Sequence, residues 1–416
     1  MRVILPGKPF HRIGLSTLWI GSTQADAGRS SSVSAIGLFV LAAAATLTIF
    51  LRGPLAGWGY ALGIFLFGGY CSVRQILVPN AFRVTVPGAA IAVISLWGFA
   101  QLVTGATVYR YATWDASLRT MALGATVWVA ACALGEASLR LRFLAAFAWF
   151  GFALSLVSVV AYFTSPGRVL WVFASPYPDV WGPFLSRNDF AGFMELSFPV
   201  ALWLSLGHAF ERQPLRFGVP IGVPAWMLAA GLASGSRAGA ILLVAEAALI
   251  LSLISGRRAA MKFFLLAGVL AAMAGAGTLA GRFAEKDPLR YRREMAASTA
   301  NMIRDHPWRG YGLGTYAYVY PAYSRFDLGG VVEHAHNYWL EWGAEGGIPL
   351  ALVWLVLALG TSVPAVRSVW GIGILAVFVH ALMDYPFARF GLTAWNFALM
   401  GALSVASVRK VSPAVH

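Results

Sequence analysis

The sequence predicts an all-α protein that crosses a membrane about twelve times. Of its 416 residues, 59% are hydrophobic and only 12% are charged, whereas about 25% of the residues of soluble domains are charged. The mean hydropathy is +0.69. Apolar runs of about 18 residues or more recur along the chain, and each can cross the hydrocarbon core as a helix. Because these runs do not alternate polar with apolar residues, a transmembrane β-barrel is excluded.

The apolar runs give the boundaries of the expected spans. Short polar or basic segments separate most of them, and two longer hydrophilic segments interrupt the series. The expected spans are 34–51, 54–73, 84–106, 120–138, 143–164, 190–208, 218–235, 238–256, 262–280, 346–364, 367–383 and 390–407.

The basic residues predict the orientation of these spans. The net charge is +14, and in a membrane protein Lys and Arg concentrate in cytoplasmic loops. If the N-terminus is cytoplasmic, every loop on its side is basic. We therefore expect both termini in the cytoplasm and membrane lipids around the helices, and we assign the positive charge to topology and not to nucleic-acid binding.

This topology divides the chain into one membrane domain with two outer loops, of which 165–189 is the shorter. In a bacterium, the outer side of the inner membrane is the periplasm. The expected parts are a cytoplasmic segment 1–33, the first nine spans within 34–280, a large periplasmic loop 281–345, and the last three spans with a cytoplasmic tail within 346–416.

Arginine is abundant on the predicted outer side, where the orientation rule does not explain it. A guanidinium presents a planar set of donors that matches phosphate oxygens. We therefore expect a cationic outer pocket for an anionic, phosphorylated substrate. The outer arginines are Arg187, Arg237, Arg290, Arg292, Arg293, Arg304, Arg309, Arg325 and Arg389.

The stretch HAHNYWLEWGAEGG places two histidines directly before an apolar run. Histidine takes up a proton near neutral pH, so His336 is a candidate general base for a hydroxyl group. The alternative is a solvated loop histidine. A metal site formed by His334 and His336 is disfavoured, because neither a cysteine nor a clear third ligand accompanies them.

Two other segments carry outer arginines. In GSRAGAILL, Arg237 stands between two apolar helices, where it either meets an anion or extends to lipid headgroups. In YRREMAASTANMIRDHPWRGYGLGTY, residues 291–304 predict a helix with Arg292 and Arg293 on its first turn. A solvated basic helix face is the alternative. The glycines that follow predict a turn, because a phosphate-binding loop would need a Lys-Ser/Thr ending and a preceding strand.

Two polar clusters lie next to predicted spans. HALMDYPFAR places His380 and Asp384 one turn apart on one helix face, with Arg389 beyond them. They form a structural pair, act as a cap within the membrane, or orient a substrate-binding arginine. In FLSRNDFAGF, Arg187 precedes Asp189, which is a candidate helix N-cap.

HNYWLEWGAEGGIPL resembles the His-Asn, nine residues, Gly pattern of the O-antigen ligase and O-antigen polymerase superfamily, at His336, Asn337 and Gly347. SRAG, the basic helix before DHPWRGYGLG, and HALMD followed by Pro386 are similar to further features of that family, in the same order. The resemblance covers roughly residues 170–400.

The resemblance implies a GT-C-type, metal-independent glycosyltransferase that needs no cofactor and acts on a polysaccharide linked to undecaprenyl diphosphate. His336 would be the catalytic histidine, and Arg237 and Arg292 would bind the diphosphate. Arg290 and Arg293 are close enough to Arg292 to be alternatives. The supporting residues would be Asn337, Arg187, Arg293, Asp384 and Arg389.

The implied mechanism is a single displacement with inversion at the anomeric carbon. A ligase would join O-antigen to lipid A-core, a polymerase would lengthen O-antigen on its carrier, and a third relative glycosylates proteins. Loop 281–345 is much longer than loop 165–189, which favours the ligase. A transporter of lipid-linked sugars is disfavoured, because the notable charges lie at the outer rim and no internal repeat is evident.

Overall fold

The computed structural model describes residues 49, 59–69, 85–177, 180–206, 218–275, 281, 290–325 and 330–406. The expected segment 1–33 and all of the first expected span except Ile49 lie outside these residues. The described residues are mostly helical, as the sequence predicts.

A short helix, Gly59–Gly69, precedes the labelled elements. The following helices are α3 (Val86–Thr104), α4 (Arg110–Ala133), α5 (Ala137–Thr164), α6 (Arg187–Ser205), α7 (Gly222–Ala233), α8 (Arg237–Ile254), α9 (Arg257–Met273), α11 (Arg290–Asp305), α12 (Tyr316–Val319), η1 (Tyr320–Ala322), α13 (Tyr338–Ser368), α14 (Ile372–His380), η2 (Pro386–Ala388) and α15 (Phe390–Ala406). The strands β1 (Arg168–Val169) and β2 (Phe173–Ala174) form an antiparallel pair after α5.

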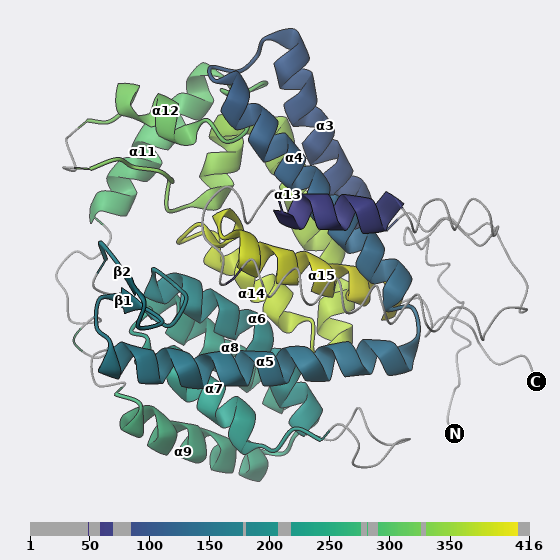
Figure 1. The fold of residues 1–416 in the computed structure, drawn as a ribbon, viewed down its shortest axis with the longest axis vertical. Coiled ribbons are helices and arrows are strands. Elements are labelled where there is room, and N and C mark those ends of the chain that lie inside the picture. The colour runs from purple at the N-terminus through teal and green to yellow at the C-terminus, as the bar shows by residue number, and fades with distance from the viewer. Residues whose placement is uncertain are drawn as a thin grey trace, which may run out of the picture.

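The helices form two groups with the C-terminal helices between them (Figure 1). In one group α3 packs along α4, and in the other α6 packs against α5, α7 and α8. Helix α14 packs against α6, while α15 packs against α4. The C-terminal helices therefore connect the two groups, and α11 lies at the rim beside α13.

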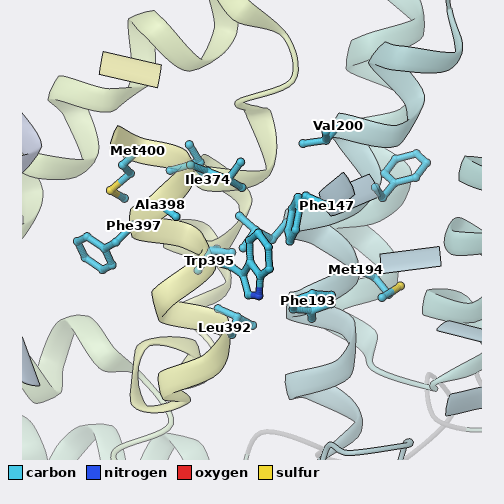
Figure 2. Packing of buried hydrophobic residues seen from close by; sticks show 14 of the residues in the cluster. Phe147, Phe193, Met194, Val200, Ile374, Leu392, Trp395, Phe397, Ala398 and Met400 are labelled. Carbon is cyan, nitrogen blue, oxygen red and sulfur yellow. The ribbon is translucent and has the colours of Figure 1, made fainter. Parts of the chain in front are cut away.

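An aromatic cluster fills the contact between α5, α6 and α15. The ring of Trp395 stacks on Phe147 with 4.5 Å between centroids, and Phe147 meets Phe193 edge to face. All three side chains are buried (Figure 2). Such aromatic pairs stabilise beyond the area that they bury, so this cluster fixes α15 against α5 and α6.

Five helices among the described residues are long and apolar enough to cross a membrane, judged by length and composition. The total of twelve spans stays a prediction. These helices are α3, α4, α5, α8 and α13.

Several helix boundaries differ from the expected ones. Helix α4 begins at Arg110, well before the expected span 120–138, and α14 is a nine-residue helix within the expected span 367–383. Hydropathy detects an apolar run but not the turns inside it. A short apolar helix is stable here because the other helices bury it.

Helix α13 begins at Tyr338, before the expected span 346–364. Most of the stretch HAHNYWLEWGAEGG, called the motif below, is therefore helical. Asn337 is the N-cap, and its Oδ1 accepts a hydrogen bond from the Leu340 amide at 3.1 Å. The helix breaks at Gly347, which has φ 76° and ψ 176°. A Cβ there would stand 2.6 Å from the backbone carbon of Trp308, so only glycine fits.

Candidate active site

His336 lies at the start of the motif, with its backbone in the left-handed region at φ 50°. Its Nδ1 is 3.1 Å from Oδ1 of Asp384, and its side chain is 33% exposed. A neutral imidazole that donates from Nδ1 has its acceptor lone pair on Nε2. The partly exposed ring is therefore arranged to take a proton on Nε2.

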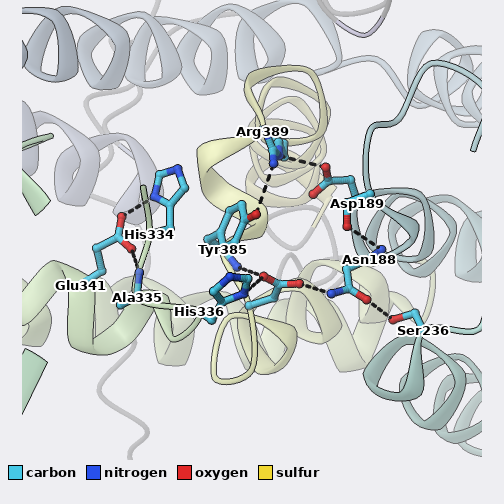
Figure 3. Close-up of polar contacts among 11 residues, drawn as sticks. Asn188, Asp189, Ser236, His334, Ala335, His336, Glu341, Tyr385 and Arg389 are labelled. Carbon is cyan, nitrogen blue, oxygen red and sulfur yellow. Dashed lines mark hydrogen bonds and ion pairs between the residues drawn. The ribbon is translucent and has the colours of Figure 1, made fainter. Parts of the chain in front are cut away.

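Asp384 is held from two further directions. The Tyr385 amide donates to Oδ1 at 3.1 Å, and Nδ2 of Asn188 donates to Oδ2. The hydroxyl of Ser236 in turn donates to Oδ1 of Asn188 at 2.8 Å. A hydrogen-bonded chain thus runs from the N-cap of α8 through the start of α6 to His336 (Figure 3).

The charge state of Asp384 follows from its surroundings. Burial alone would raise the pKa of this carboxyl group. The hydrogen bond with His336 and the positive charges of His336, His380 and Arg292 outweigh burial and lower the pKa to about 2. Asp384 is therefore ionised at neutral pH and stabilises positive charge on the His336 ring.

Asp189 is not the N-cap of α6, contrary to the prediction. Ser186 is the cap, because its hydroxyl accepts from the Asn188 amide at 3.1 Å. Asp189 lies within the first turn and is 2.9 Å from Nε of Arg389. Helix α14 ends at His380, so Asp384 lies in the turn that follows and not on the same helix face. The Asp384 amide donates to the His380 carbonyl at 3.0 Å, while the two side chains bind different partners.

His334 is paired with the motif helix. Its Nδ1 is 2.8 Å from Oε1 of Glu341, whose Oε2 accepts from the Ala335 amide at 2.8 Å. Its ring stacks on Tyr385 with 4.4 Å between centroids, and Tyr385 meets His336 edge to face. Burial would lower the pKa of His334, but the charge and hydrogen bond of Glu341 outweigh burial and raise it.

A cavity of about 640 Å³ opens beside His336 and is called here the basic cavity. Two predicted arginines, Arg187 and Arg389, line it together with His334 and His336. The remaining walls are Tyr177, Leu185, Ser186, Asn188, Tyr291, Met295, Val331, Val332, Glu333 and Tyr385.

Arg237 and Arg292, both within the described chain, are not among the residues that line the basic cavity. Arg292 is half-buried on the first turn of α11, and its charge acts on Asp384. Arg290 and Arg293 are exposed. Arg237 is half-buried as the first residue of α8, directly after Ser236.

A second cavity of about 390 Å³ is also lined by His334 and is called here the acidic cavity. It shares only His334 and Glu333 with the basic cavity. Its acidic residues are Asp115, Glu333, Glu341 and Glu345, and Arg119 also lines it. Its aromatic residues are Tyr111, Tyr316, Tyr318, Tyr338, Trp342, Trp354, Phe387 and Phe390.

Residues 223–355 match the family model described as O-antigen ligase. The predicted family resemblance is confirmed for this segment. The O-antigen ligase segment contains Arg237, Arg292 and His336, whereas Asp384 and Arg389 follow it in sequence. Together with the apolar helices, the family match indicates a membrane protein. No curated protein matches the chain.

Sequence reasoning missed three residues of the site. Glu341 binds His334, Tyr385 packs on both histidines, and Ser236 supports Asn188. Ser236 immediately precedes Arg237, so its capping role was open to inference from serine before an apolar helix. Nothing in the sequence indicates the contacts of Tyr385, because they join the turn after α14 to the motif.

Proposed function

We propose that this protein is an O-antigen ligase. In this proposal it transfers O-antigen polysaccharide from undecaprenyl diphosphate to a sugar hydroxyl of lipid A-core, with inversion of the anomeric carbon. The observation that carries the proposal is the His336–Asp384 pair, which faces a basic cavity and begins inside the O-antigen ligase segment.

His336 acts as the general base. Asp384 accepts the Nδ1 hydrogen and holds the ring, so that Nε2 is available for the hydroxyl proton of the acceptor. As the proton transfers, the imidazole becomes positively charged beside an ionised carboxylate, which stabilises it. A buried aspartate beside a catalytic histidine acts in this way in hydrolase triads.

The acceptor oxygen, as it loses its proton, forms a bond to the anomeric carbon of the donor. The bond between that carbon and the diphosphate oxygen breaks, and its electron pair leaves with undecaprenyl diphosphate. His336 carries the proton until it passes to solvent or to the departing diphosphate. Attack opposite the leaving group inverts the configuration.

Arginine supplies the positive charge that this step requires. Arg187 lines the cavity, Arg292 acts on the same site from α11, and Arg237 begins α8 beside the Asn188 network. Their guanidinium groups are suited to bind the two phosphates and to stabilise charge on the leaving group. Arg389 is already paired with Asp189, so we assign it to the cavity wall.

The proposal includes a location and a topology. We infer a bacterial inner-membrane protein of about twelve helices and GT-C-like architecture, with cytoplasmic termini and a periplasmic active site. The basic loops of the sequence and the five apolar helices support it. Attachment of the donor to a lipid carrier explains why the site needs a membrane body.

The decisive experiment uses purified full-length protein with undecaprenyl-diphosphate-linked O-antigen, lipid A-core and EDTA. The intact protein should form O-antigen linked to lipid A-core. His336→Ala should abolish the product, and Arg237→Ala and Arg292→Ala should reduce it. His306→Ala is the matched control, since His306 is exposed and lines neither cavity.

Other products would decide between the family activities. Longer chains on the donor without transfer to lipid A-core would identify a polymerase, and product on a protein acceptor would identify a protein O-oligosaccharyltransferase. Transfer that persists in His336→Ala would overturn the mechanism. If the folded protein forms no glycosidic bond but moves the donor across vesicle membranes, it is a transporter.

A further inference from the structure

A second polar pair lies deeper in the molecule, below the bond between Asp384 and His336. Nδ1 of His380 is 2.8 Å from Oε1 and 3.0 Å from Oε2 of Glu195. The two side chains are 2% and 0% exposed. Buried ion pairs are costly to form, and to lose one partner is costlier still. The mechanism above does not use this pair, so its presence in an apolar body requires an explanation.

The pair continues a regular arrangement of α6 and the end of α14. Asn188 and Glu195 are about two turns apart on one face of α6, and His380 is about one turn before Asp384. Helix α6 therefore holds the end of α14 at two levels, through Asn188 with Asp384 and through Glu195 with His380.

The segment from the end of α14 to Asp384 also binds the start of α13. The amide of Asp384 donates to the carbonyl of His380 at 3.0 Å, and the amide of Tyr338 donates to the carbonyl of Ala381 at 2.8 Å. The indole of Trp339 donates to the carbonyl of Phe378 at 3.0 Å. A displacement of His380 would therefore be transmitted both to Asp384 and to the start of α13.

The charges around His380 come from three directions. Glu195 binds it from α6, Asp384 follows it in the turn, and Arg292 acts on it from α11. Asp189 of α6 also interacts with its charge. Glu246 of α8 lies within electrostatic range of Glu195, but among the described residues neither of its carboxyl oxygens has a hydrogen-bond partner.

We propose that His380 and Glu195 are positioning residues for His336. Their buried pair fixes the turn that carries Asp384, and Asp384 then holds the His336 ring at hydrogen-bonding distance. The expected loss of glycosyl-transfer rate rests on the proposed function, whereas the expected change in the position of the His336 ring does not. A displacement of about 1 Å at a reacting group can reduce the rate about 100-fold.

The variants Glu195→Gln and His380→Gln test the proposal in the full-length protein. Each is expected to reduce kcat about 10- to 100-fold while leaving KM for the donor unchanged. The acidic limb of the rate profile should move to lower pH, because a displaced Asp384 no longer favours the protonated ring of His336. Glu246→Gln is the matched control, since it removes another buried carboxyl group that makes no hydrogen bond to His380.

A second readout does not require catalysis. Diethyl pyrocarbonate modifies the unprotonated imidazole, and fragment-ion mass spectrometry, which distinguishes His336 from His334 in the same peptide, gives the extent of modification at each pH. Modification of His336 should extend to lower pH in Glu195→Gln and His380→Gln but not in Glu246→Gln. A double variant, Glu195→His with His380→Glu, restores the pair in reverse and should return the wild-type dependence.

The outcomes separate the two proposals. If the wild-type protein transfers no sugar but the modification of His336 shifts as expected, the positioning role stands and the proposed function fails. The positioning role is overturned if the pH dependence of His336 modification in Glu195→Gln and His380→Gln stays as in the wild type. It is also overturned if that dependence shifts no more than it does in Glu246→Gln. If a single variant does not fold, the folded double variant decides: a wild-type dependence supports the proposal and a shifted one overturns it.

Discussion

The two cavities that meet at His334 have opposite linings. The basic cavity contains His336, Arg187 and Arg389, whereas the acidic cavity has four carboxyl groups and a wall of aromatic rings. Within that wall, Trp342 and Trp354 stack with 3.9 Å between centroids and nearly parallel planes. Only His334 and Glu333 belong to both cavities.

This difference separates two kinds of ligand chemistry. Arginine side chains bind phosphate oxygens, so a diphosphate is favoured in the basic cavity and disfavoured among the carboxyl groups. Carboxylates accept hydrogen bonds from hydroxyl groups, and aromatic rings present flat apolar surfaces for carbohydrate rings. We therefore expect the donor diphosphate in the basic cavity and acceptor sugars in the acidic cavity.

The largest expected effect comes from Asp384→Asn. An amide cannot stabilise a charged imidazole, and it also changes which ring nitrogen of His336 carries the hydrogen. We expect the rate of glycosyl transfer to fall by about 10³-fold or more, as for the aspartate of hydrolase triads. Single-turnover rates with bound donor measure it. Glu333→Gln is the comparison, and an equal loss there would contradict a specific role for Asp384.

Loss of an arginine should weaken donor binding. Arg187→Ala and Arg292→Ala are each expected to raise KM for the donor about 10- to 100-fold, because a hydrogen bond to a charged group contributes about 1.5 to 3 kcal/mol. KM for the acceptor should stay unchanged. Arg304→Ala is the control from the last turn of α11. Equal effects on donor and acceptor would remove the distinction between the cavities.

Substitutions in the acidic cavity should raise KM for the acceptor and leave KM for the donor unchanged. Asp115→Asn and Glu345→Gln are expected to raise KM for the acceptor about tenfold, which corresponds to about one hydrogen bond. Steady-state kinetics with each substrate varied in turn provide the measurement. If these variants raise KM for the donor instead, the donor occupies the acidic cavity and the assignment is reversed.

The smallest expected effect concerns the stability that His334, which lines both cavities, contributes through its pairing with Glu341. Because the pKa of His334 is raised above its ordinary value of 6.5, its pairing with Glu341 stabilises the fold fully below about pH 6.5. This contribution is lost as pH rises through the folded-state pKa. Wild-type protein should therefore exceed Glu341→Gln in Tm at low pH, by a difference that shrinks toward alkaline pH. A difference that grows with pH would contradict the pairing.

Much of the fold was predictable because apolar length and helix start and stop signals indicate where helices lie. The helix expected at 291–304 is confirmed as α11, and most other expected spans overlap a helix. Hydropathy placed the start of an expected span at 346, next to the break at Gly347, but it could not show that α13 extends back across the break to Tyr338. That break depends on the backbone of Pro307 and Trp308, which is distant in sequence.

The site was predictable where a residue type alone carries chemistry. His336, Arg187 and Arg389 were expected on the outer side, and they line one cavity. The partners were not predictable, because they depend on how helices meet. Asp384 was expected one turn after His380, where it lies, but its bond to His336 was not expected, and Glu195 lies in an apolar run where only its charge distinguishes it.

The backbone of His336 also determines how the site can be captured with its substrates. A non-glycine residue at φ 50° costs roughly 1–2 kcal/mol, although asparagine tolerates this region better than most residues. Asparagine at position 336 should keep the turn into Asn337 and α13 while lacking a group that takes a proton at neutral pH. A protein with His336→Asn is therefore the form in which donor and acceptor can remain bound together, unreacted, for structure determination.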